Sequence, residues 1–443
     1  METNQISIGI FFDGTGNNGL NATSTYKPSK NNGSYYSSTT NIYKLFGLFT
    51  GDRKIYIEGI GTLTGKEDSD FAMATCKNPA RYTGYSSDDK LEKAFAFVNE
   101  KIKDKAEEYH FYVYGFSRGA MLARTFCYEL LKTGSKITGN IKVKFLGVFD
   151  TVESTPFNDY NVSILPGVEN ALHLCAVNEC RYFFPLTGFF EDSDNMKDTK
   201  TGTETSVWKE IFIPGAHADV GGGYLEGPQS VYVSADYRKT TDVEAYVDHV
   251  RNTKKDADGN YIWNELLTDY RIDEGIFFSQ AYVARDLVYN DLSKVYGKLV
   301  ALETNTIEQV FSTHFTSSDF EIDPKKHPFL IVFSEKLEKY VKDLSPELKP
   351  GYKYDDFVEY THISANFGLH KAVLLQRSES EIDVEMINNS LNVPGNPTIH
   401  EPDIFPSQFQ KGIPYLQESS VIDYAYGTNI PNNDIWYRSI LIK

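Results

Sequence analysis

The chain has 443 residues, with 44 Lys or Arg and 61 Asp or Glu, so its net charge is −17 at neutral pH. Hydrophobic residues make up 41% and charged residues 24%, which is typical of a globular protein and excludes a disordered, collagenous or coiled-coil chain. The acidic excess argues against nucleic-acid binding, because that affinity comes mainly from Lys and Arg side chains that neutralise phosphates.

Cysteine content and the N-terminal sequence bear on where the protein is made. The four cysteines are too few and too irregularly spaced for a disulfide scaffold, so we expect reduced thiols. The N-terminus lacks a basic region followed by a long apolar run, and no segment approaches the roughly 18 apolar residues of a membrane span. We therefore expect synthesis in the cytoplasm without a signal peptide. The 30 Tyr and 29 Phe indicate aromatic-rich packing, with a lipid-facing surface as the alternative.

The first half of the sequence alternates strand-like and helix-like segments, which is typical of a parallel sheet covered by helices. Strands are predicted at residues 6–12, 54–59, 109–115, 141–149 and 207–213. Helices are predicted at residues 40–49, 86–105, 118–133 and 168–181.

This alternation weakens after residue 225. Residues 276–303 are predicted to form one long helix or two shorter ones, and residues 328–334 a strand. The last 60 residues are predicted to be loop-rich, because Pro and Asn interrupt them repeatedly.

The strongest motif is G-x-S-x-G at residues 115–119, between a predicted strand and a predicted helix. This context is typical of a nucleophile elbow, in which a sharp turn exposes a strained serine, here Ser117. Glycines two residues before and after remove side chains that would clash. The helix that follows directs its N-terminal N–H groups toward developing negative charge.

A serine nucleophile needs a base and an orienting acid, in the chain order Ser, Asp or Glu, His. Asp150 and His217 both follow predicted strands, so we expect them at the same sheet edge as Ser117. The triad Ser117–Asp150–His217 satisfies both conditions. Two alternatives stay open, one that uses Asp219 with His362 and one that combines Asp150 with His362.

The oxyanion hole is predicted to use the backbone N–H of Arg118 and a donor from the Gly-rich loop at Gly14 and Thr15. Asp13 is a candidate to hold that loop in place, and Asp219 to cap a turn or orient a loop. The sequence shows no zinc-type ligand spacing and no EF-hand, so we predict no metal and no cofactor. Calcium stays an open alternative, with Asp13 and Asp219 as its first candidate ligands.

These observations predict an α/β fold of the α/β-hydrolase type, with a mostly parallel sheet and a nucleophile elbow. Residues 1–225 are expected to form the catalytic core. Residues 226–443 are expected to form an accessory or cap region packed on that core.

Six motifs follow one another in the first half: FFDGTGNN (11–18), GIGT (59–62), YGFSRGAMLARTF (114–126), FLGVFDTV (145–152), HLCAVNECRYFF (173–184) and PGAHADVGGGY (214–224). Together they resemble the uncharacterised-domain α/β hydrolases that include type VI secretion phospholipase effectors, the first lipase-effector family. The resemblance implies a serine phospholipase of the A type that cleaves acyl esters of phospholipids. It assigns the triad to Ser117, Asp150 and His217, in agreement with the topological argument.

The resemblance also implies an antibacterial effector that the type VI system secretes into the target-cell periplasm. Its implied partners are a phospholipid membrane as substrate, a secretion spike protein and an immunity protein. In that family a second domain helps to engage membrane, a role that would fall to residues 226–443. The alternatives are a soluble carboxylesterase and a non-catalytic hydrolase-fold binding or adaptor protein.

Overall fold

The computed structural model describes residues 5–28, 32–102, 107–133, 135, 139–155, 159–368, 370 and 429–442. Its centre is a seven-stranded sheet of order β2-β1-β3-β4-β5-β8-β7, in which every neighbouring pair is parallel except β7 and β8. The strands are β1 (Gln5–Phe12), β2 (Arg53–Ile57), β3 (Glu108–Phe116), β4 (Asn140–Phe149), β5 (Asn170–Ala176), β7 (Thr199–Gly202) and β8 (Val207–Ile213). The expected mostly parallel sheet is thus confirmed.

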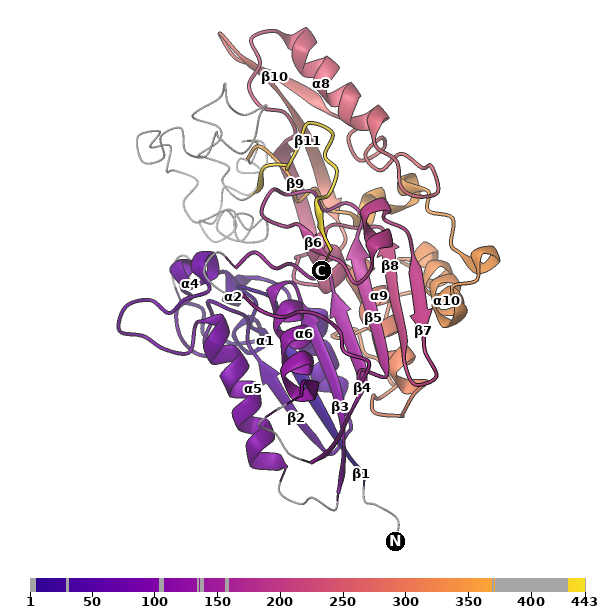
Figure 1. Ribbon diagram of the computed structural model, residues 1–443. Coiled ribbons are helices and arrows are strands. Elements are labelled where there is room, and N and C mark those ends of the chain that lie inside the picture. The colour runs from indigo at the N-terminus through magenta and orange to yellow at the C-terminus, as the bar shows by residue number, and fades with distance from the viewer. Residues whose placement is uncertain are drawn as a thin grey trace.

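Helices cover both faces of this sheet (Figure 1). On one face lie α5 (Ser87–Lys101) and α6 (Arg118–Leu131), and on the other lie α3 (Asn41–Leu48), α9 (Leu292–Asn305) and α10 (Pro328–Asp343). Strand β1 shows why both faces are apolar: Ile10 belongs to the core under α5 and α6, whereas Phe11 belongs to the core under α3 and α9. Strands buried on both sides read as continuous hydrophobic runs.

A second, antiparallel sheet has the order β10-β11-β9 and lies beyond the carboxyl ends of the central strands (Figure 1). Helix α8 packs against β11, and α9 contacts both α3 and α7. The remaining strands are β6 (Leu186–Thr187), β9 (Gly227–Tyr232), β10 (Arg271–Glu274), β11 (Ser279–Val288) and β12 (Ile440–Leu441). The remaining α-helices are α1 (Gly19–Ala22), α2 (Gly33–Tyr36), α4 (Asp70–Thr75), α7 (His217–Gly221) and α8 (Thr240–Thr253).

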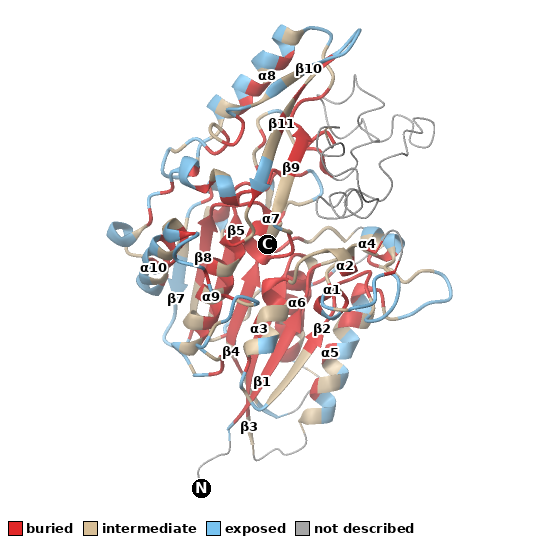
Figure 2. Cartoon of the chain, turned by 180° about the vertical axis from the view of Figure 1, so that it is seen from behind, coloured by how far each residue is buried: buried red, intermediate tan, exposed pale blue. Residues whose placement is uncertain are grey.

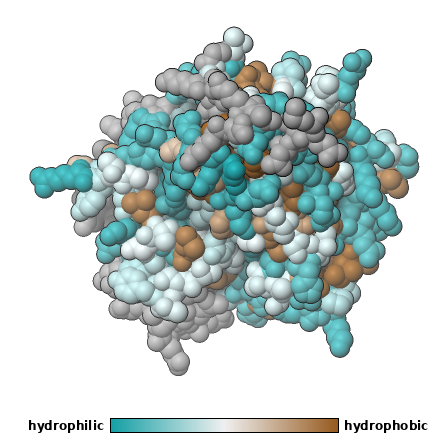
Figure 3. All heavy atoms as spheres, turned by 90° about the horizontal axis from the view of Figure 1, so that it is seen from below, coloured by the Kyte–Doolittle hydropathy of each residue, from teal (hydrophilic) through white to brown (hydrophobic). Residues whose placement is uncertain are grey.

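The opposite end of the molecule, where β1 and β3 begin, is shown in Figure 3. Where grey atoms do not cover it, this face is mainly hydrophilic, with hydrophobic residues as isolated spots. Each of the four cysteines lies in the described part of the chain and is buried as a free thiol, at Cys76, Cys127, Cys175 and Cys180.

Three predicted elements differ from the structure. The helix predicted at 168–181 is wrong: β5 occupies 170–176, buried between β4 and β8, and a short apolar run does not distinguish a buried strand from a buried helix. The strand predicted at 328–334 is also wrong, because Pro328 starts α10 and helical spacing of apolar residues continues to Val341.

The helix predicted over 276–303 is partly wrong, because β11 fills its first half and only α9 is helical. The pair Asn290 and Asp291 separates the two elements, and Asp291 is the N-cap residue of α9. Most of the predicted loops in the last 60 residues lie outside the described residues.

Candidate active site

Ser117 lies in a sharp turn between β3 and α6 and has a positive φ of 58° with ψ of −129°. Its backbone N–H donates to the carbonyl oxygen of Phe149 at 3.0 Å, which fixes the turn against the end of β4. A Cβ at Gly115 would lie 2.5 Å from Cα of Ala120, and one at Gly119 would lie 2.2 Å from the carbonyl oxygen of Asp13. Both glycines of the motif are therefore needed for close backbone approach.

His217 and Asp150 come together at the same edge of the sheet. Asp150 follows β4 with a positive φ of 46°, and His217 is the first residue of α7. Nδ1 of His217 lies 2.5 Å from Oδ2 of Asp150, so this imidazole donates from Nδ1 and leaves Nε2 as an acceptor. The ring of Phe116, the residue before Ser117, lies 4.6 Å from the His217 ring between centroids. Among the described residues no hydrogen bond joins Oγ of Ser117 to His217.

The surroundings of Asp150 and His217 determine the protonation state of each side chain. Burial alone would raise the pKa of Asp150, but Arg438 and His217 hold that pKa well below its usual range. Burial lowers the pKa of His217, although its hydrogen bond to Asp150 acts in the opposite direction. The carboxyl group is therefore ionised and the imidazole neutral near neutral pH, which is the state that a general base needs.

Arg438 is the residue that sequence reasoning missed. Its guanidinium forms an ion pair with Oδ1 of Asp150, 288 residues earlier in the chain, and both side chains are fully buried. The backbone N–H of Ala176 donates to the same oxygen at 2.8 Å. No motif surrounds Arg438 in the sequence, so only the folded chain reveals this contact.

The predicted oxyanion donors are only partly available. The N–H of Gly14 donates to Oδ1 of Asp13 at 2.8 Å, so the prediction that Gly14 supplies a donor is wrong. The side chain of Arg118 donates from Nε to Oγ1 of Thr15 at 2.9 Å, which ties the loop to the start of α6. Within the described part of the chain, the backbone N–H groups of Arg118 and Thr15 have no acceptor. These two N–H groups remain the candidate donors.

Asp13 is a buried support for this loop. Its carboxylate accepts hydrogen bonds from Gly14 N–H, from Oγ1 of Thr40 at 2.7 Å and from the hydroxyl of Tyr56 at 2.5 Å. Burial outweighs these three donors and raises the pKa of Asp13 to about 6. Both oxygens of the Asp13 carboxylate thus accept hydrogen bonds from groups of the protein itself.

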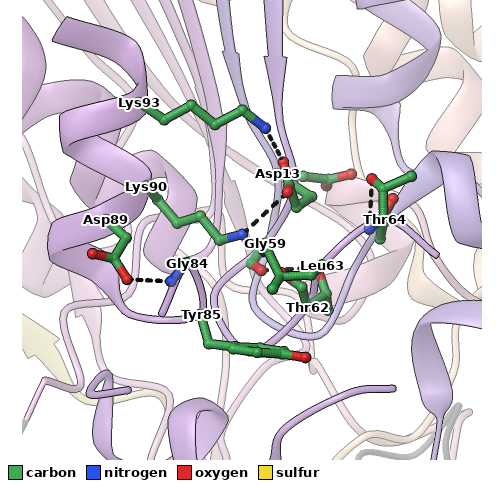
Figure 4. A network of polar contacts seen from close by, with 12 residues as sticks. Asp13, Gly59, Thr62, Leu63, Thr64, Gly84, Tyr85, Asp89, Lys90 and Lys93 are labelled. Atoms are coloured by element: carbon green, nitrogen blue, oxygen red, sulfur yellow. Dashed lines mark hydrogen bonds and ion pairs between the residues drawn. The ribbon is translucent and has the colours of Figure 1, made fainter. Parts of the chain in front are cut away.

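The loop after β2 lies behind the Gly-rich loop. Gly59 N–H donates to the carbonyl oxygen of Asn17 at 2.8 Å, so the two loops are hydrogen-bonded. Lys90 and Lys93 extend from α5 toward this region (Figure 4), and both contact Glu58. Nζ of Lys90 donates to the carbonyl oxygen of Thr62 at 2.7 Å, and burial lowers the pKa of Lys90 to about 8. Two buried charges, Lys90 and Glu58, and the more exposed Lys93 therefore support the loop after β2.

Asp219 has a structural role in a second Asp–His pair. Its carboxylate accepts from Ala216 N–H at 2.9 Å, which caps α7, and from Nδ1 of His362 at 2.6 Å. The ring of His362 stacks on Tyr224 with centroids 4.2 Å apart. The combination of Asp150 with His362 is not formed, because Asp150 bonds to His217. The contact of His217 with the residue before Ser117 favours His217 over His362.

One group of potential metal ligands occurs among the described residues: His173, Cys175 and Glu210, all buried. Nδ1 of His173 bonds to Glu210 at 2.7 Å, and its Nε2 accepts the N–H of Thr151 at 3.1 Å. Both ring nitrogens are therefore occupied, and the group does not fit a metal ion.

Known proteins resemble this chain in sequence and in fold. A family model described as type VI secretion system phospholipase effector Tle1-like, catalytic domain, matches residues 7–135 and 129–241, more than half of the chain. The structure of the Tle1 effector bound to the VgrG spike is similar in fold, with a TM-score of 0.56 and 20% identity, over 82% of this chain and 85% of that one. An uncharacterized protein from Pseudomonas aeruginosa is 18% identical, with a TM-score of 0.36, over 97% of this chain and 60% of that one.

No curated protein matches the chain. The family match covers the strand and turn that carry Ser117, the end of β4 that carries Asp150, and the helix that begins at His217. The family resemblance noted in the sequence is confirmed, and the chain belongs to the Tle1-like phospholipase effectors of the type VI secretion system.

Proposed function

We propose that the protein is a serine phospholipase of the A type, with Ser117 as nucleophile, His217 as base and Asp150 as orienting acid. The observation that carries this proposal is the 2.5 Å contact between Nδ1 of His217 and Oδ2 of Asp150, beside the strained turn at Ser117. A positive φ at a non-glycine residue costs free energy and is concentrated at functional sites.

In this mechanism, Nε2 of His217 takes the proton of Ser117 as Oγ attacks the carbonyl carbon of an acyl ester. Asp150 fixes the imidazole tautomer and stabilises the imidazolium that forms. The N–H groups of Arg118 and Thr15 hold the oxyanion, and His217 then returns the proton to the leaving alcohol. Water, activated by the same histidine, releases the fatty acid from the acyl-enzyme.

The test is release of fatty acid from phospholipid vesicles by the wild type and by Ser117→Ala. We expect the variant to lose activity by about 10⁶-fold, because nucleophile and base act as one unit. Ser163→Ala is the matched control, since Ser163 is exposed on the surface. A fluorophosphonate should label the wild type at Ser117 and leave the Ser117→Ala variant unlabelled.

Two other outcomes separate the alternatives. Hydrolysis of short soluble esters without release of fatty acid from vesicles would indicate a carboxylesterase. Neither hydrolysis nor labelling at Ser117 would contradict the enzyme proposal and indicate a binding protein with a hydrolase fold.

A lipid-binding role for the accessory region is supported by the tip of the β10–β11 hairpin. Ile276, Phe277 and Phe278 are consecutive, and their exposed fractions are 93%, 76% and 49%. Figure 2 shows this end of the hairpin as exposed, and Figure 1 shows it beyond the carboxyl ends of the central strands. Burying one large apolar side chain contributes about 1.5–3 kcal/mol, so we propose that this tip inserts into the lipid surface.

The charged residues beside the hairpin tip indicate which lipid the binding test should use. Arg271 is balanced by Asp273 and Glu274, so the hairpin has no basic cluster that would require anionic lipid. We expect the double variant Ile276→Ser/Phe277→Ser to bind zwitterionic vesicles more weakly than the wild type and to hydrolyse soluble esters normally. Val332→Ser, at a half-exposed apolar side chain on α10, is the control. Unchanged vesicle binding by the double variant would contradict the proposal.

Delivery is the third part of the proposal. The similar Tle1 effector is described in complex with the VgrG spike of the secretion system. We propose a spike protein as partner of this chain too, with secretion into the target-cell periplasm, antibacterial action there and an immunity protein that neutralises it. Among the described residues no helix is long and apolar enough to cross a bilayer. Killing of competitor cells that requires both the secretion system and Ser117 would test this part.

A further inference from the structure

The carboxylate of Asp150 is bound on both of its oxygens. Oδ2 faces His217, whereas Oδ1 receives the Ala176 N–H and the Arg438 guanidinium. The rotation of the carboxylate is therefore set by groups on two sides. A fully buried carboxylate without a positive partner would take up a proton, and a protonated Asp150 could not stabilise the His217 imidazolium.

Arg438 is itself held rigidly. The nitrogen that meets Asp150 also donates to the carbonyl oxygen of Ala176 at 3.0 Å, and the other terminal nitrogen donates to the carbonyl oxygen of Phe184 at 3.2 Å. The first carbonyl belongs to the last residue of β5, the strand next to β4, and the second lies in the loop that follows β5. The guanidinium thus bridges the catalytic acid, the end of β5 and the loop after it.

Arg438 is held in place by the contacts of the segment 429–442, to which it belongs. Its strand β12 pairs with β6, and Asn432 N–H donates to the carbonyl oxygen of Cys180 at 2.9 Å. Trp436 is buried against Trp263 with ring centroids 5.4 Å apart, and Nε1 of Trp263 donates to the carbonyl oxygen of Trp436 at 2.8 Å. The position of Arg438 therefore depends on docking of the whole segment.

Other charges near His217 do not replace Arg438. Arg181 and Glu179 are both buried, and they form a salt bridge with each other at 2.9 Å. Their effects on His217 are opposite in sign, because Arg181 lowers its pKa and Glu179 raises it. Arg438 is the cation in direct contact with Asp150 within the described part of the chain.

We propose that Arg438 is a positioning residue for the Asp150–His217 pair, so that the catalytic site is complete only when the segment 429–442 is docked on the core. This inference rests on the proposed function, because it assumes that Asp150 and His217 are catalytic. It adds a dependence of the reaction on a segment that lies outside the matched catalytic domain.

The experiment compares the full-length wild type with Arg438→Ala and Arg438→Lys on a soluble ester. We expect Arg438→Ala to lose about 100-fold in kcat/KM, mainly in kcat, because a small misplacement of the catalytic pair is costly. Arg438→Lys should recover part of this loss. Free guanidinium, far below concentrations that unfold proteins, should restore activity to Arg438→Ala in a saturable way.

The pH profile gives a second readout that a purely structural role would not move. Without the Arg438 cation, the Asp150–His217 pair holds its shared proton more tightly, so the acid limb of kcat/KM should move to higher pH. Arg285→Lys is the matched control, because Arg285 is a partly buried arginine that bonds to the carbonyls of Val358 and Thr361. Its acid limb should stay at the wild-type pH, and guanidinium should not raise its activity.

Each result decides one question. A folded Arg438→Ala variant with unchanged kcat/KM overturns the inference. The inference is also overturned if activity is lost, neither Arg438→Lys nor guanidinium restores it, and the acid limb stays at the wild-type pH. If Arg438→Ala does not fold, Arg438→Gln, which also removes the charge, takes its place, and its acid limb decides in the same way. A wild type without Ser117-dependent ester hydrolysis contradicts the proposed function instead, so the two failures are distinguishable.

Discussion

The carboxylate of Asp219 forms hydrogen bonds with both the side chain and the backbone N–H of His362. Nδ1 of His362 bonds to Oδ1 at 2.6 Å, and its N–H donates to Oδ2 at 2.9 Å. The same carboxylate caps the helix that starts with His217, through Ala216 N–H. Asp219 therefore joins α7 to a segment 143 residues later. The site thus has two Asp–His pairs that share one short helix, and they should differ in what they do.

The two pairs can be separated by histidine variants. We expect His217→Gln to lose activity by about 10⁶-fold, because the base is removed. His362→Gln should keep most of its kcat/KM and lose about 1–3 kcal/mol of unfolding free energy, since a buried carboxylate loses one donor. Steady-state kinetics and thermal unfolding measure both. The reverse ranking of the two activities would favour the alternative triad through Asp219 and His362.

Asp150→Asn should leave the nucleophile and the base in place. We expect a loss of about 10⁴-fold near neutral pH, smaller than for Ser117→Ala, because the imidazole loses its tautomer and its counter-charge. The hydrogen bond from His217 to Asp150 raises the histidine pKa, so its removal should move the acid limb of kcat/KM to lower pH. An acid limb that stays in place would mean that Asp150 does not act on the base. This shift is opposite to the one expected for Arg438→Ala.

Gly119→Ala should disrupt the site without touching a reactive group. The new Cβ would lie 2.2 Å from the carbonyl oxygen of Asp13, so the Gly-rich loop and α6 must separate. We expect loss of most esterase activity and a lower unfolding temperature. Gly47→Ala in α3 is the control, because nothing lies within 4 Å of its Cβ, and it should stabilise the protein by about 0.5–1 kcal/mol. Normal activity in Gly119→Ala would show that the close approach is not needed.

The pKa of Asp13 predicts a pH dependence of stability. Burial raises this pKa from 3.8 to about 6, so the native state binds the proton more tightly than the unfolded state. The stabilisation is present below pH 3.8 and is lost as pH rises through about 6, by about 3 kcal/mol in total. Denaturant unfolding from pH 4 to 7 should show this slope in the wild type. The slope should be smaller in Asp13→Asn, and an identical slope in the two proteins would contradict the assignment.

Local patterns predicted the central sheet well. The strands that end at Phe12, Phe116 and Phe149 each stand alone as an apolar run with a polar or Gly-rich turn after it, and the structure confirms them. The predictions for the segment around Asn170 and for the one after Pro328 were wrong. The spacing of apolar residues and the length of such a segment do not distinguish a short buried strand from a buried helix. Tertiary neighbours decide these cases, since β5 is a strand through its hydrogen bonds to β4 and β8.

The site was predictable only where its residues sit at strand ends. Chain order and strand ends placed Asp150 and His217 at one edge, and the 2.5 Å contact between them follows from that placement. The sequence indicated Asp13 as a support for the Gly-rich loop, but not that its carboxylate would occupy the N–H of Gly14, because that depends on the exact path of the loop. Arg438 had no local signal at all, because a long-range ion pair leaves no periodicity in the sequence.

The distance along the chain between Asp150 and Arg438 also has a consequence for biosynthesis. A ribosome must add 288 further residues after the acid before its counter-ion exists. In an unstructured chain, closing a loop of that length would cost about 5 kcal/mol of chain entropy beyond a constant, so this contact is favoured only once the intervening segments have folded. A nascent chain that has already built its β-sheet would still lack the counter-ion of Asp150. Under the proposed function, it would therefore have no finished esterase site until residues 429–442 are made and docked.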